Sequence, residues 1–119
     1  MTFMKTDIEF DEEAFLRIKK LGGDELLRKM IDIFLDRVPN RIKAAQDALK
    51  TMDFKTIRYE AHSIKSSAGN LGAGSLQRHA QTAELLAENN DDAGLDESIK
   101  NISLHYEAFA EIFCERIKQ

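Results

Sequence analysis

Apolar residues recur every three or four positions along most of the chain, and this spacing predicts helices. No stretch shows the sustained alternation of apolar and polar residues that indicates a strand, so we expect no β-hairpin. The first predicted helix is short. It covers residues 12–21, with Asp11 as its N-cap and the glycine pair at 22–23 as its end.

A longer helix follows from Asp24 to Leu49, and Pro39 within it is expected to bend or restart the helix. Three more helices are predicted after it: about 53–71, which stops at Gly72; about 75–88, capped by Ser75; and about 95–117. Each long helix has one apolar stripe, and the connections are short. The pattern therefore predicts an all-α fold, an antiparallel four-helix bundle with the short first helix as a lid.

The composition agrees with a single soluble domain spanning residues 1–119. Apolar residues make up 43% and charged residues 32%, as in folded rather than disordered chains. The net charge of −4 argues against nucleic acid as a partner, because phosphate binding needs a basic face. No apolar run is long enough to span a membrane, and no signal peptide is visible. We expect a cytoplasmic protein, free-standing or cut from a larger one, in which the lone Cys114 packs as a small core residue.

The helix predicted over 53–71 has a clear core stripe: Phe54, Ile57, Ala61, Ile64, Ala68 and Leu71. At about 100° per residue, His62 points roughly 140° away from the centre of this stripe. His62 therefore does not fit the usual interpretation of a histidine packed in the core. The other two histidines, His79 and His105, lie beside apolar stripes, and we expect them to pack at the boundary of the core.

The neighbours of His62 on a helix surface lie three or four residues away from it. They are Arg58, Lys65, Ser66 and Gly69, which make a face of two cations and two small residues around an exposed imidazole. Small neighbours would let the active site of a partner approach the ring, and the cations would balance the charge of about −2 on a phosphoryl group. The geometry alone leaves an alternative open, in which His62 is an ordinary histidine on a solvated helix face.

Other chemistries lack the residues that they need. A di-iron bundle places glutamate three residues before histidine, and no histidine here has that neighbour. No pair of histidines has zinc-ligand spacing, and one cysteine is too few for a structural zinc site. The glycines at 72 and 74 do not form a phosphate-binding loop, because no strand precedes them. We therefore expect no metal, no cofactor and no self-contained enzyme.

The stretch from Glu60 to Ala73, E-A-H-S-I-K-S-S-A-G-N-L-G-A, followed by Leu76 and Glu84, resembles the signature of histidine-containing phosphotransfer (HPt) domains. The resemblance covers most of the chain, including F-D-E-E-A-F-L-R-I-K-K-L-G-G-D-E-L, I-D-I-F-L-D-R-V-P-N-R-I and A-L-K-T-M-D-F. The phosphoacceptor helix pair of histidine kinases is a poorer match. That family usually has an acidic residue and a proline where this chain has Ser63 and Ser67.

The resemblance implies a role for each matching residue. His62 matches the phosphoacceptor, whose Nε2 would attack the aspartyl phosphate of a receiver domain and then pass the phosphoryl group to another receiver. Lys65 matches the lysine that steadies the phosphoryl group, and Gly69 matches a small residue that keeps the docking face open. Glu84 lies where the family often has a Gln or Glu that holds the histidine ring, although it could instead be a solvated residue. Ser66 replaces the usual glycine but is still small enough for docking.

The implied partners are receiver domains of response regulators and hybrid histidine kinases in a two-component phosphorelay. Magnesium and the catalytic groups would come from the receiver, so the resemblance implies a monomeric relay intermediate without kinase activity of its own. The alternative function is a helical adaptor that binds receivers, or sequesters phosphate, without passing it on. Phe15 and Ile18, with Leu26 and Ile33, would supply apolar contact for docking unless they only close the bundle.

Overall fold

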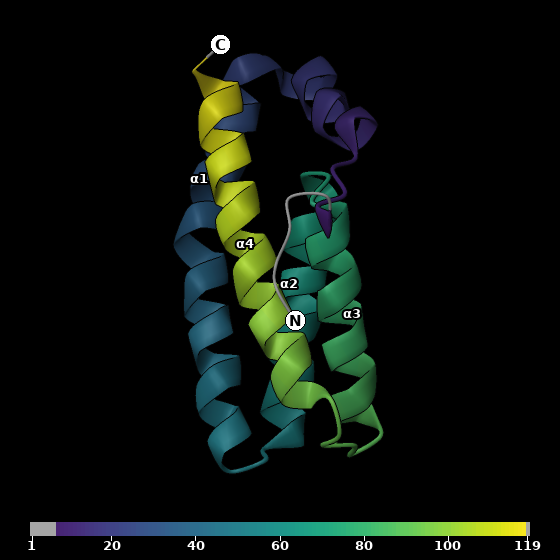
Figure 1. Cartoon of the computed structure of the whole chain (residues 1–119). Helices are drawn as coiled ribbons and strands as arrows, with labels where there is room; N and C mark the ends of the chain where they lie inside the picture. The colour runs from purple at the N-terminus through teal and green to yellow at the C-terminus, as the bar shows by residue number, and fades with distance from the viewer. Residues whose placement is uncertain (1–6, 119) are drawn as a thin grey trace.

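The computed structural model describes residues 7–118, and these form four helices; residues 1–6 and 119 of the predicted domain lie outside that description. The helices are α1 (Glu12–Lys50), α2 (Phe54–Asn70), α3 (Gly74–Glu88) and α4 (Leu95–Ile117). They run side by side in alternating directions (Figure 1), and α1 and α3 each pack against both α2 and α4. The predicted all-α four-helix bundle is confirmed.

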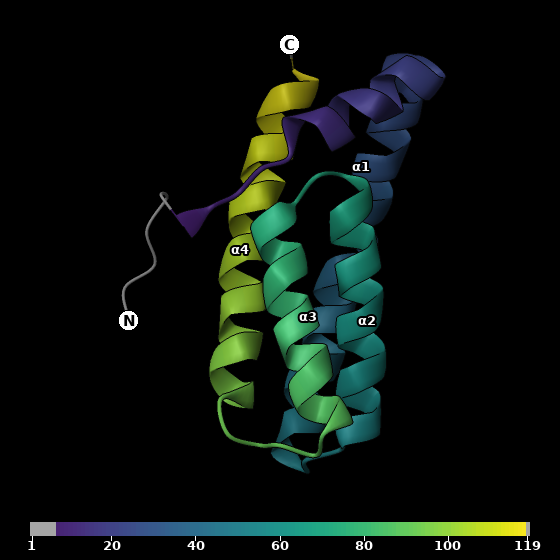
Figure 2. The ribbon, with the colours of Figure 1, turned by 90° about the vertical axis from the view of Figure 1, so that its right-hand side faces the viewer.

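The backbone of α1 breaks at Gly23, which has φ 71° and ψ −166° inside an otherwise helical segment. Glycine adopts this conformation readily, whereas a side chain would be strained in it. The part of α1 before Gly23 forms an arm that crosses the end of the bundle, as Figure 2 shows. This arm is the predicted lid helix. Its Phe15 and Ile18 are buried in the core, so they close the bundle and are not free for docking.

Pro39 lies inside α1 without ending it, so the expected restart of the helix at this residue is wrong. Proline has no N–H to donate to the carbonyl four residues earlier, which is that of Leu35. The hydroxyl of Tyr106 on α4 lies 3.5 Å from the Leu35 carbonyl oxygen, a long hydrogen bond that partly replaces the missing one. The Tyr106 hydroxyl of α4 thus partly compensates for the backbone hydrogen bond that is lost at Pro39.

The N-termini of α2 and α3 are formed in different ways. Asp53 caps α2, and its side-chain oxygen accepts from the backbone N–H of Thr56 at 3.2 Å. The prediction that Ser75 caps α3 is wrong. The helix begins one residue earlier, at Gly74, and its N-cap Ala73 makes no side-chain hydrogen bond.

An extended segment before α1 pairs with the turn between α2 and α3. The Ser75 hydroxyl serves this pairing rather than a cap, because it accepts from the backbone N–H of Glu9 at 3.1 Å. The Ser75 N–H donates to the Glu9 carbonyl in return, and the Asp11 N–H donates to the Gly72 carbonyl at 2.7 Å. Gly72 has φ +80°, and a Cβ added to it would collide with the Asp11 carbonyl oxygen. The chain therefore requires glycine at this point of the turn.

Aromatic side chains fill the core along α4, and small side chains fill it between α2 and α3. The buried ring of Phe113 contacts those of Phe15, Phe34 and Phe109 at centroid distances of 5.2 to 5.8 Å. The buried stripes of α2 and α3 are rich in alanine: Ala61, Ala68, Ala80, Ala83 and Ala87. Small side chains let two helices approach closely. This close approach brings side chains of α3 within reach of the α2 surface.

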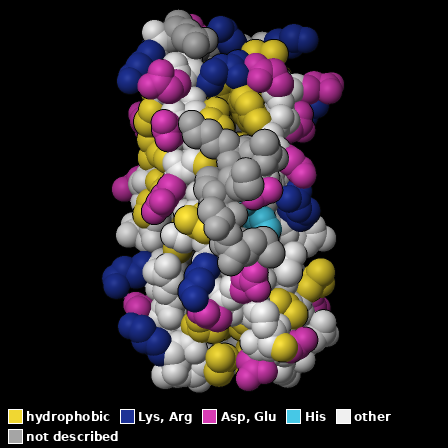
Figure 3. All heavy atoms as spheres, viewed as in Figure 1, with side chains coloured by type: hydrophobic (Ala, Val, Ile, Leu, Met, Phe, Trp, Pro, Cys, Tyr) yellow, Lys and Arg dark blue, Asp and Glu magenta, His cyan; other side chains and the backbone are white. Residues whose placement is uncertain are grey.

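The surface carries charges of both signs and a few apolar side chains. On the face that carries α4, acidic and basic side chains are interspersed (Figure 3). Cys114 is half-buried on α4, so it packs at the margin of the core rather than inside it. Leu26 is partly buried against the core, whereas Ile33 remains 41% exposed. Among the described residues, no helix combines the length and the hydropathy needed to cross a membrane.

Candidate functional site

His62 lies on α2 and points away from the core, as its position outside the apolar stripe predicts. The stripe residues Ile57, Ala61 and Ile64 are buried, whereas the His62 side chain is 60% exposed. The helical period produces this separation, because a step of about 100° per residue places His62 on the side of α2 opposite its buried stripe. The ring is therefore available to a molecule that approaches from solvent.

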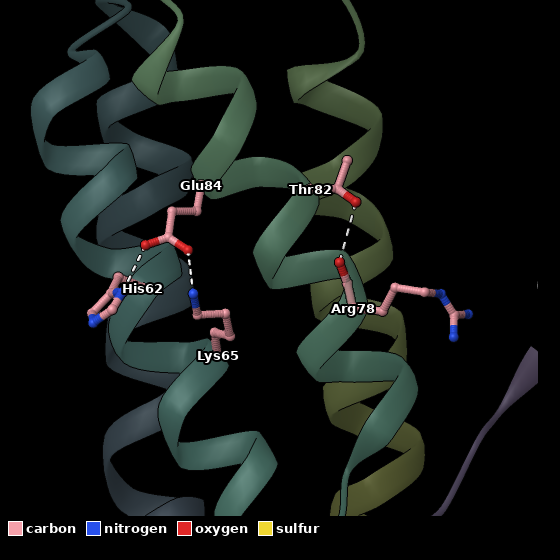
Figure 4. A network of polar contacts seen from close by, with 5 residues as sticks. All are labelled: His62, Lys65, Arg78, Thr82 and Glu84. Carbon is pink, nitrogen blue, oxygen red and sulfur yellow. Dashed lines mark hydrogen bonds and ion pairs between the residues drawn. The ribbon is translucent and has the colours of Figure 1, made fainter.

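Glu84 of α3 contacts His62 from the neighbouring helix. Its Oε2 atom lies 2.6 Å from Nδ1 of the His62 ring, and Figure 4 shows the carboxylate turned toward α2. The Glu84 side chain is only 15% exposed, because it lies in the seam between α2 and α3. The alternative interpretation of Glu84 as a solvated helix residue is therefore excluded.

Lys65 binds the second oxygen of the same carboxylate. Its Nζ atom lies 2.6 Å from Oε1 of Glu84, and the Lys65 side chain is 26% exposed. Burial by itself raises the pKa of Glu84, but the hydrogen bonds and charges of Lys65 and His62 outweigh burial and leave this pKa below its ordinary value. Glu84 is therefore an ionised carboxylate at neutral pH.

The ionised carboxylate determines which ring nitrogen of His62 carries the proton. A carboxylate can only accept hydrogen bonds, so Nδ1 bears the hydrogen of the neutral ring and Nε2 keeps its lone pair. In Figure 4 the second ring nitrogen points away from both Glu84 and Lys65. In this tautomer the lone pair lies on an exposed nitrogen that a second protein can reach.

The remaining predicted docking residues occupy two different places. Arg58 and Ser66 are exposed on α2 and, within residues 7–118, take no part in the hydrogen bonds described above. Gly69 is half-buried and faces α3, where an added Cβ would lie 2.6 Å from Nε2 of Gln77. Gly69 therefore leaves room for a side chain of α3. Gln77 was not among the predicted residues, although its spacing of seven residues from Glu84 places both on one side of a helix.

His79 and His105 form a separate cluster, with ring centroids 4.4 Å apart. His79 is half-buried, at the boundary as expected, but His105 is only 2% exposed and lies deeper than predicted. Nδ1 of His105 lies 2.8 Å from the Ser75 hydroxyl oxygen. Burial, together with the charges of His79 and Arg78, lowers the pKa of His105 to about 4. This ring packs the bundle and cannot be reached by a partner.

Across residues 7–118, no group of three or more His, Cys, Asp or Glu side chains is placed to hold a metal ion. At His62, the described residues place one carboxylate and one ammonium group behind a single imidazole.

Comparison with known proteins assigns the chain to a family. The model of the family described as the Hpt domain matches residues 29–112. Histidine-containing phosphotransfer protein B (HptB) from Pseudomonas aeruginosa PAO1 has 20% sequence identity and a TM-score of 0.87, covering 92% of this chain and 95% of that one. The histidine-containing phosphotransfer domain of ArcB from Escherichia coli has 21% identity and a TM-score of 0.78, covering 92% and 93%.

At these identities the solved structures show a shared fold. The comparison with curated proteins gave no match. The family model is more informative, because it spans well over half of the chain and includes His62, Lys65 and Glu84. The chain therefore belongs to the Hpt domain family.

Proposed function

We propose that this chain is a phosphorelay intermediate that receives a phosphoryl group on Nε2 of His62 from the aspartate of one receiver domain and passes it to another. The observation that supports this function most strongly is the exposed His62 ring whose Nδ1 is bound to the Glu84 carboxylate. Membership of the Hpt domain family supports the reaction class, phosphotransfer.

In the proposed step, the Nε2 lone pair attacks phosphorus, an N–P bond forms, and the bond from phosphorus to the aspartate oxygen breaks. The electron pair of the broken bond leaves with the aspartate carboxylate, so no proton has to move. The ring becomes a cation that keeps its hydrogen on Nδ1, and the Glu84 carboxylate, 2.6 Å away, opposes that charge. Transfer to the second receiver reverses each of these changes.

The proposed partners are receiver domains of response regulators or hybrid kinases, which would hold the Mg²⁺ ion themselves. We propose that they dock over the exposed face of α2, where Arg58 and Ser66 are accessible beside the ring. A groove of about 120 Å³ lies along the α1 side of this helix, lined by Met30, Ile33, Phe34, Ser67, Asn70 and Leu71. Ile33, 41% exposed in this groove, would supply apolar contact.

A transfer assay tests the proposed function. A panel of receiver domains, labelled on aspartate with a radioactive acyl phosphate, is incubated with the wild type, His62→Gln and His79→Gln. We expect the wild type and His79→Gln to take up label that is labile to acid and stable to alkali, and His62→Gln to take up none. Equal uptake by the wild type and His62→Gln would contradict the proposal. Binding to receivers without uptake by any variant would favour the adaptor function instead.

A further inference from the structure

The ammonium group of Lys65 is bound on the side of His62 that faces away from the nucleophile. It lies 2.6 Å from Oε1 of Glu84, whose Oε2 accepts from Nδ1 of His62. Figure 4 shows Nε2 at the far end of the ring from both partners. We propose that Lys65 is a positioning residue, which fixes the Glu84 carboxylate and through it the tautomer and plane of His62 before any phosphoryl group arrives. This inference rests on the proposed role of His62.

The need for Lys65 follows from the freedom of a glutamate side chain. Glutamate has three rotatable side-chain bonds, and ordering such a chain costs rotamer entropy. A single hydrogen bond from a ring that is itself 60% exposed leaves the carboxylate free to turn. The second bond, from Lys65 to the other oxygen, fixes the carboxylate plane at both ends. Lys65 also contributes to the lowered pKa of Glu84 and so keeps it an acceptor for Nδ1–H.

The role of Lys65 in the transfer step then runs through Glu84. As the N–P bond forms and the aspartate carboxylate leaves, the His62 ring gains positive charge. The Glu84 carboxylate stabilises this charge best when Lys65 holds the carboxylate in place. The sequence resemblance suggests a different role, in which Lys65 contacts the phosphoryl oxygens directly. The two roles differ in one measurable respect: a positioning lysine has no effect once Glu84 has been removed, whereas a phosphate-binding lysine keeps its effect.

The first test measures the tautomer of His62 in the unphosphorylated protein by ring ¹⁵N NMR. The wild type should show a protonated, pyrrole-type Nδ1 and a pyridine-type Nε2. Glu84→Ala and Lys65→Met should both shift His62 toward a mixture of tautomers, and Lys65→Arg should restore the wild-type signature. Lys55→Met, which removes an exposed lysine from the same helix, is the matched control. Wild-type tautomer populations in Lys65→Met, with an unchanged urea unfolding midpoint, would overturn the inference.

The second test is a double-mutant cycle on the rate of transfer from a phosphorylated receiver domain. Lys65→Met should slow transfer by no more than Glu84→Ala does, and the double variant should be no slower than Glu84→Ala alone. If Lys65→Met slows the Glu84→Ala protein by the full factor that it causes in the wild type, Lys65 acts on the phosphoryl group directly and the inference fails. If the wild type takes up no phosphate, the proposed function fails, while the tautomer measurement still decides the positioning role.

Discussion

The buried ring of His105 should make the bundle lose stability on mild acidification. Its pKa is lowered to about 4 by burial first, and then by the charges of His79 and Arg78, while Asp7 and Glu9 act in the opposite direction. The ordinary pKa of 6.5 applies to the unfolded chain. Below that value, the unfolded chain binds a proton at His105, whereas the folded chain leaves this ring neutral until the pH nears about 4. Stability is therefore complete above about pH 6.5 and falls as the pH approaches about 4.

The size of this effect follows from the gap between the two pKa values. At about 1.36 kcal/mol for each pKa unit, the gap corresponds to a loss of about 3 kcal/mol of unfolding free energy. The ring is only 2% exposed, so solvent screening reduces this figure little. A loss of that size is a large part of the stability of a small domain, typically about 5–15 kcal/mol. Carboxylates whose pKa is lowered, such as Glu84 and Asp53, lose their contributions only as the pH falls below their ordinary pKa values of 4.5 and 3.8.

Urea unfolding of the wild type and His105→Asn between about pH 7 and about pH 4 measures the effect. Asparagine cannot titrate, and its amide oxygen can take the place of Nδ1 opposite the Ser75 hydroxyl. The unfolding free energy of the wild type should fall by about 3 kcal/mol more than that of the variant over this range. Equal losses in the two proteins would refute the reasoning. A direct NMR titration of His105 in the wild type, expected near 4, provides a second check that needs no variant.

Three further predictions concern the fold and are checked by urea unfolding. Gly72→Ala should cost about 2 kcal/mol or more, because φ is +80° and the new Cβ meets the Asp11 carbonyl. Gly94→Ala has the same φ, but its new Cβ would make only an ordinary contact of 4.0 Å with Leu86, so it should cost less; equal costs would remove the collision as the cause. Asp53→Ala should cost about 1 kcal/mol through the lost cap, and no change would show that α2 needs none. Phe113→Ala should cost about 3–5 kcal/mol, because it removes a fully buried ring from the aromatic cluster. A smaller cost would show that the surrounding side chains collapse into the cavity.

Periodicity alone predicted the features that depend on local geometry. The apolar stripe of α2 defines the buried face, and the same arithmetic places His62 outside it, where the structure finds it. The break at Gly23 and the cap at Asp11 were also predicted, because glycine and aspartate have strong local preferences at helix ends. These features require no knowledge of how one helix packs on another.

Features that depend on packing between helices were not predictable in this way. The hydroxyl of Ser75 looks like a helix cap in sequence, but in the fold the extended segment at Glu9 uses it. Pro39 lies inside α1, and the Leu35 carbonyl that it cannot bond lies 3.5 Å from the Tyr106 hydroxyl of α4. The bond between Glu84 and Lys65 depends on how closely α2 approaches α3 and in what register. The spacing of residues within one helix contains no information about these contacts.

The most direct test of the central claim is to observe the phosphorylated nitrogen itself. The ¹⁵N-histidine-labelled protein is mixed with a phosphorylated receiver domain and Mg²⁺, and the ring signals of all three histidines are followed by NMR. The account predicts that only the His62 signals change, that phosphorus becomes bonded to Nε2, and that Nδ1 keeps its proton beside Glu84. Phosphorylation at Nδ1 of His62, or at another histidine while His62 is unchanged, would contradict it.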